Sequence, residues 1–173
     1  MGAWAGPFVV AALLLAIAGG LKAYDPTMTV GALRAAGRRV PGGVVRSAGG
    51  VEAVLAIAAA ITGFPVLAGA VGVSYLLFTA FVIVALTRHL PIGTCGCFGR
   101  VDTPPSVWHV VVNLGAATSA FAVAARDGGG IASVVRDQPL AGVPFLLLVL
   151  AGAYAAFAVL TVVPQLVAQR SRG

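Results

Sequence analysis

The sequence has 173 residues, of which 60% are hydrophobic and 9% are charged, and its formal net charge is +6. A soluble domain carries about 25% charged residues to cover its surface, so this composition excludes an ordinary soluble fold. Its mean hydropathy is +1.02, and no compact basic region remains outside the apolar runs, which argues against nucleic-acid binding. We predict a single domain, residues 1–173: an all-α, polytopic helical bundle in contact with membrane lipid.

The first apolar run predicts a membrane span over residues 3–21, because a helix needs about 20 apolar residues to cross a bilayer. No basic residue precedes the run and no small-residue cleavage pattern follows it, so we interpret it as a retained helix rather than a secretory signal peptide. Between Lys22 and Ser47, arginines lie beside apolar residues. This pattern predicts a short helix in the membrane interface, which Pro41-Gly42-Gly43 should end.

Residues 53–87 contain no charged residue, and this stretch is too long for one span. Gly63-Phe64-Pro65 divides it, which predicts two spans, over about 49–62 and 66–87, joined by a tight turn. A fourth span is predicted over about 107–125 and a fifth over about 143–163. The glycine-rich, polar segment Arg126–Gln138 is expected to be a loop between them.

Five spans place the two termini on opposite sides of the membrane. Arg126 and Arg136 then lie on the N-terminal side, and the other nine of the eleven basic residues lie on the C-terminal side. The positive-inside rule predicts that the C-terminal side, which includes the loop after the third span, is cytoplasmic. The chain is thus expected in the plasma membrane as a multi-pass protein.

The two cysteines of the chain, Cys95 and Cys97, lie together in the loop after the third span. A disulfide across one residue closes a small, strained ring, which Gly96 makes easier to form. A strained disulfide exchanges readily, and the nearby Arg88 and Arg100 favour the reactive thiolate. The motif therefore predicts a redox couple, with structural cysteines as the alternative.

A zinc site is a further interpretation, because His89 and His109 flank the cysteines and would complete a Cys2His2 set. The spacing matches no common zinc finger, so we predict that the chain binds no metal.

Glu52 is expected at the start of the second span, on the same side of the membrane as the cysteines. Ionisable residues within spans are costly and commonly functional, and a carboxyl near a dithiol can accept and return protons. Equally, Glu52 can be a carboxylate at a helix N-terminus, paired with Arg46 or Lys22. We expect Trp108 to anchor at the interface and Asn113 to hydrogen-bond another helix.

These residues resemble the family of the methylamine-utilisation protein MauE, among the DoxX-like membrane proteins. The resemblance rests on Lys22-Ala23-Tyr24-Asp25, Glu52 and Cys95-Gly96-Cys97-Phe98-Gly99, and extends over about residues 10–125. An arginine expected near the start of the fourth span is replaced here by His109 and Asn113.

The resemblance implies a thiol-disulfide redox protein that acts on a thioredoxin-fold partner outside the cytoplasm and helps to mature a disulfide-containing protein of amine metabolism. This location disagrees with the positive-inside count. Cys95, Cys97 and Glu52 would be the site residues of such an oxidoreductase; no cofactor is required, although a quinone is a possible electron carrier. The alternative is a non-enzymatic scaffold or chaperone-like subunit.

Overall fold

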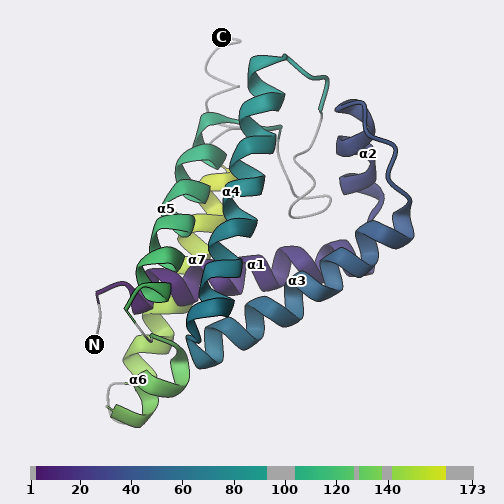
Figure 1. The fold of residues 1–173 in the computed structure, drawn as a ribbon. Helices are drawn as coiled ribbons and strands as arrows, with labels where there is room; N and C mark the ends of the chain where they lie inside the picture. The colour runs from purple at the N-terminus through teal and green to yellow at the C-terminus, as the bar shows by residue number, and fades with distance from the viewer. Residues whose placement is uncertain (1–2, 93–103, 127–128, 138–141, 163–173) are drawn as a thin grey trace.

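The computed structural model describes residues 3–92, 104–126, 129–137 and 142–162, and all regular structure in these residues is helical. Five helices are long and apolar enough to cross a membrane. Two short helices, α2 and α6, accompany them (Figure 1). The bounds are α1 Ala5–Tyr24, α2 Thr27–Ala35, α3 Gly42–Thr62, α4 Pro65–Thr87, α5 Val107–Ala124, α6 Ile131–Asp137 and α7 Gly142–Thr161. The predicted all-α membrane bundle, with a short helix after its first span, is confirmed.

The second long helix begins earlier than the sequence predicted. Its first residue is Gly42 rather than Gly49, and Pro41 precedes it in an extended conformation with φ −60° and ψ 141°. A proline before a helix leaves no backbone N–H to satisfy there, so Pro41 starts α3 instead of ending α2. Helix α2 ends instead before Gly37, which has φ +79° and follows the cap residue Ala36.

The segment Arg126–Gln138 is not only a loop, because it contains α6. Ile131 and Val134 are spaced so that they share one face of a helix. Val134 is 2% exposed and Ile131 packs against the main core. Packing of this apolar pair stabilises a helix too short to form alone.

The long helices do not all run in one direction. In Figure 1, α4 and α5 run side by side with α7 behind them, while α1 crosses all three steeply. Helix α3 returns beside α1, and α2 lies at the outer end of that pair. The main core forms where α1 meets the other long helices: Phe8, Val9, Ala11, Leu15, Ala56, Ala59, Ala68, Val71, Tyr75, Ala117, Ala120, Val123 and Val149.

The close approach of α1 and α3 depends on two glycines. A Cβ atom on Gly19 would lie 2.7 Å from the carbonyl oxygen of Gly49, and one on Gly49 would lie 2.7 Å from that of Gly19. Small residues at such a contact allow two backbones to pack closely.

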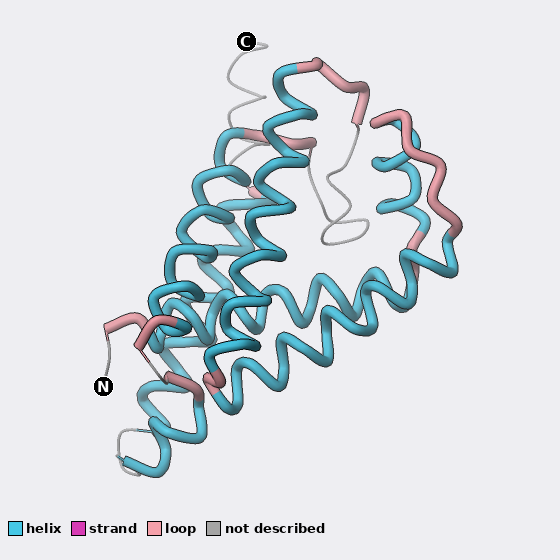
Figure 2. Tube along the Cα trace, viewed as in Figure 1, coloured by secondary structure: helices cyan, strands magenta, loops and turns pink. Residues whose placement is uncertain are grey.

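The predicted turn at Gly63-Phe64-Pro65 is confirmed. Gly63 ends α3 with φ +62°, a value that favours glycine. Its N–H donates to the carbonyl oxygen of Ala59 at 2.8 Å, and Pro65 opens α4 two residues later. Figure 2 shows the result as a short non-helical link between two long helices.

Candidate functional site

Cys95 and Cys97 lie outside the described residues, but both flanks of their segment are described. The chain leaves α4 and returns to α5 at the same end of the bundle, the end where α2 lies (Figure 1). Ile92, 7% exposed, packs in a small cluster with Ala32 of α2 and Ala85 of α4. The segment that holds the cysteines therefore starts from an anchored position beside α2.

The most unusual contact in the described residues is a buried ion pair between Lys22 and Glu52. The Nζ atom of Lys22, near the end of α1, contacts Oε2 of Glu52 on α3. Their side chains are only 10% and 14% exposed. Lys22 Nζ also lies 4.6 Å from the centroid of the Phe78 ring of α4, close enough for a cation–π interaction.

The local sequence explains how the two charges meet. Lys22 lies in the last turn of α1, where the helix dipole favours a cation. Gly49 precedes Glu52 by one turn, and a Cβ there would lie 2.8 Å from Cβ of Lys22. The absence of that side chain lets the stem of Lys22 lie against α3 and reach the carboxylate one turn further on.

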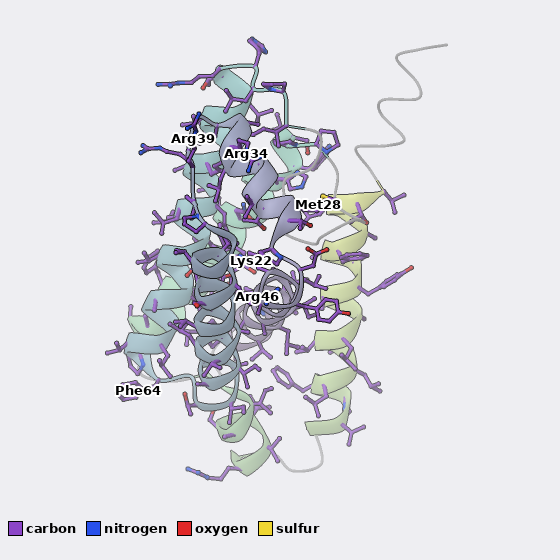
Figure 3. All side chains as sticks on the ribbon, turned by 90° about the vertical axis from the view of Figure 1, so that its right-hand side faces the viewer. Lys22, Met28, Arg34, Arg39, Arg46 and Phe64 are labelled. Carbon is purple, nitrogen blue, oxygen red and sulfur yellow. The ribbon has the colours of Figure 1, made fainter. Side chains whose placement is uncertain are left out.

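One expectation for Glu52 was wrong and another is confirmed. Because α3 begins at Gly42, Glu52 lies well inside the helix, too far from its N-terminus for a capping role. The alternative pairing with Lys22 is correct. Arg46, the other suggested partner, donates instead to the carbonyl oxygen of Tyr24 at 3.4 Å. Figure 3 shows Arg46 and Lys22 where α1 and α3 come together below α2.

Asp25 does not join the buried pair. Its Oδ1 accepts hydrogen bonds from the backbone N–H and the hydroxyl of Thr27, at 3.1 and 2.6 Å. These bonds satisfy donors in the first turn of α2, as helix-capping side chains do. In the family-like segment Lys22–Asp25, the charge of Lys22 thus enters the bundle, and that of Asp25 binds the first residue of α2.

His109 and Asn113 lie one turn apart on α5 and are 2% and 8% exposed. Nδ1 of His109 lies 2.9 Å from the hydroxyl of Ser106, the residue before the helix. Both line a cavity of about 20 Å³ together with Tyr75 and Phe78 of α4, a volume that accommodates one water molecule.

Phe78 connects the ion pair with this cavity, and the sequence analysis missed it. Its ring contacts the Lys22 ammonium on one side and lines the His109–Asn113 cavity on another. Tyr75 packs edge-on against it, with ring centroids 6.1 Å apart, and donates its hydroxyl to the carbonyl oxygen of Ala11 at 2.7 Å. In a long run without charged residues, no sequence signal distinguishes these aromatics from residues that face lipid.

The zinc interpretation stays untested. In the part of the chain that the structure describes, no three His, Cys, Asp or Glu side chains are grouped to hold a metal ion, but the cysteines are not in that part. His89 is exposed after α4, with φ +48°, whereas His109 is buried. Trp108 is 45% exposed at the start of α5, a position compatible with interfacial anchoring.

A comparison with family models matches residues 2–126 to the methylamine utilisation protein MauE. The chain belongs to the MauE family. Comparisons with curated proteins and with solved structures found no match.

The MauE match covers α1 to α5 and thus Lys22, Glu52, both cysteines and the His109–Asn113 pair. Helices α6 and α7 lie beyond it. The chain is therefore a multi-pass membrane protein of the MauE family, and the structure adds that the family-like charges of α1 and α3 form one buried pair.

Proposed function

We propose that this MauE-family protein exchanges electrons between a Cys95–Cys97 dithiol and a thioredoxin-fold protein, in the maturation of a disulfide-containing partner. The observation that carries the proposal is the Cys-Gly-Cys motif in a membrane chain of this family, whose described residues also include the buried Lys22–Glu52 pair. A motif of two cysteines around one glycine forms a disulfide that is easily exchanged.

The exchange proceeds through a mixed disulfide. A thiolate of one cysteine attacks the partner's disulfide, one partner sulfur leaves as a thiolate, and an intermolecular S–S bond forms. The second cysteine then attacks the mixed disulfide, which releases the reduced partner and leaves Cys95–Cys97 oxidised. Two electrons move to the partner, and the two protons lost by the dithiol are taken up by the partner's thiolates. The reverse sequence oxidises the partner.

In this proposal Glu52 transfers protons to and from the dithiol, and a quinone is the candidate for the final electron carrier. What supports this role is that Phe78, whose ring faces the Lys22 ammonium, also lines a cavity with room for one water molecule. Lys22 would hold the carboxylate in place.

The experiment uses the full-length chain in membranes, with Cys95→Ser, Cys97→Ser and the double variant. Each single variant should lose partner redox change completely. The variant that keeps the attacking cysteine should also trap a mixed disulfide with the partner, because its resolving thiol is missing. The readout is the partner's thiol state after alkylation, and membrane insertion of each variant is the control. Full activity in either single variant would contradict the proposal.

A second measurement locates the couple. In intact cells, a membrane-impermeant maleimide is applied before and after mild reduction. Labelling of Cys95 and Cys97 that appears only after reduction indicates a reversible disulfide on the outer side. The same dependence seen only in opened membranes places the couple inside or within the bundle.

The rival function is a scaffold that holds a partner without chemistry, with Glu52 and the cysteines structural. The observation that favours it is the Lys22–Glu52 pair itself, which connects α1 to α3 and needs no catalytic role. A scaffold should keep its activity when both cysteines are replaced, whereas a redox couple should titrate at a defined potential.

A further inference from the structure

Three arginines line one open hollow beside α2. The hollow has a volume of about 790 Å³ and is bounded by Val30, Arg34, Arg38, Arg39, Val40 and Pro41, with Gly37. The three arginines are exposed, while Val30 and Val40 are half-buried. We call this feature the arginine hollow.

The turn after α2 brings the arginines together. The N–H of Arg38 donates to the carbonyl oxygen of Leu33 at 2.8 Å, and that of Gly37 to the carbonyl oxygen of Arg34 at 2.9 Å. This pair of bonds is the Schellman motif, in which a left-handed residue reverses the chain at a helix end. Gly37 supplies that residue with φ +79°. The reversal returns Arg38 and Arg39 to the side of Arg34.

No negative charge of the described chain balances the arginine hollow. Of the acidic side chains that the structure describes, Asp25 caps Thr27 and Glu52 pairs with Lys22. None of them forms an ion pair with Arg34, Arg38 or Arg39. Three cations in one hollow repel one another unless an anion joins them.

We propose that the arginine hollow binds the phosphate headgroup of an anionic membrane lipid. Guanidinium groups bind phosphate oxygens through paired N–H donors, and the half-buried Val30 and Val40 suit the glycerol and first methylenes of a lipid. The position agrees, because α2 lies where α1 ends and α3 begins, and Ala32 fixes it to the bundle end through Ala85 and Ile92. Figure 3 shows Arg34 and Arg39 at that end.

One amphiphile would use both parts of the arginine hollow, because its headgroup would contact the arginines and its first methylenes the valines. An acidic protein surface is the competing occupant. Three probes separate these possibilities. Phosphatidylglycerol has a negative charge and acyl chains, phosphatidylcholine has acyl chains but no net charge, and soluble glycerol phosphate has the charge but no acyl chains.

The test measures lipid affinity of the full-length protein in detergent by native mass spectrometry. The variants are Arg34→Gln/Arg38→Gln/Arg39→Gln and the control Arg88→Gln/Arg126→Gln/Arg136→Gln, which removes the same charge elsewhere. Phosphatidylglycerol affinity should fall about fivefold for each arginine lost from the hollow and change little in the control. Phosphatidylcholine should bind all forms equally weakly, and glycerol phosphate should not compete.

Two further variants keep the test decisive if the triple variant does not fold. Arg39→Gln alone should lower the affinity about fivefold. Gly37→Ala should also weaken binding, since it strains the turn without removing a charge. Equal losses in both triple variants, effective competition by glycerol phosphate, or an effect only on binding of a thioredoxin-fold protein would each overturn the proposal.

Discussion

Lys22 and Glu52 are charged side chains that the fold removes from solvent. A buried pair carries a desolvation cost that its mutual attraction only partly offsets, and the apolar surroundings of these spans increase that cost. The Phe78 ring lowers it by facing the ammonium at 4.6 Å. Loss of one partner should therefore matter more than loss of both.

The residue-scale prediction is a double-mutant cycle. Lys22→Met should destabilise the protein by about 3–5 kcal/mol, because the carboxylate of Glu52 stays buried without its partner. Lys22→Met/Glu52→Gln should recover most of that loss, since neither charge remains. The free energy of unfolding in detergent is measured for these two variants and for Glu52→Gln alone, and additive effects of the two single changes would contradict a direct pairing.

The same variants separate the two roles of Glu52. If the carboxyl transfers protons, Lys22→Met/Glu52→Gln should exchange electrons with the partner more slowly than the wild type, even though its stability is restored. A double variant with normal stability and normal exchange would leave Glu52 a structural residue only.

At the scale of elements, the contact between α1 and α3 decides where the charges lie. Gly19 and Gly49 let the two backbones approach, and this approach places Lys22 against the turn of α3 that carries Glu52. Neighbouring glycines differ sharply: a Cβ on Gly20 would meet nothing within 4 Å. Sequence alone does not distinguish the two members of the Gly19-Gly20 pair.

Gly19→Ala and Gly20→Ala test this contact. Gly19→Ala should destabilise the protein by about 1–3 kcal/mol, because its methyl group would overlap the backbone of α3. Gly20→Ala should be neutral or slightly stabilising, as alanine is the better helix former. Thermal unfolding in detergent compares them, and similar effects would show that α1 and α3 do not pack in this way.

At the scale of the whole molecule, the long helices expose their apolar side chains outward. Leu147 and Leu148 of α7 are 63% and 72% exposed, and Val54 of α3 is 69% exposed. Such surfaces are too apolar for water and suit the hydrocarbon of a bilayer. The α3–α4 turn and the arginine hollow then lie at opposite ends, as Phe64 and Arg39 do in Figure 3.

A topology experiment follows from this arrangement. With Cys95 and Cys97 changed to serine, Phe64→Cys and Arg39→Cys should label from opposite sides of the membrane. The positive-inside rule predicts that Phe64→Cys reacts with impermeant maleimide in intact cells and Arg39→Cys only in opened ones. Labelling from one side would contradict the order of spans, and the inverse pattern would contradict only the orientation.

The sequence by itself determined the features that depend on local composition. Apolar runs of spanning length, the turn at Gly63-Phe64-Pro65 and the short helix near Arg34 all follow from a few adjacent residues. The start of α3 was not predicted, because Gly42 is a poor helix former. Helix α6 was not predicted either, because it is stabilised by the packing of Ile131 against the core.

Only the tertiary structure decided how distant residues meet. Lys22, Glu52 and Phe78 come from three helices, and the close packing of α1 against α3 depends on which glycine faces which backbone. In a nearly uniform apolar chain, hydrophobic periodicity cannot indicate the inward face of a helix. Close packing at the small residues supplies that information instead, and it appears only when the helices are assembled.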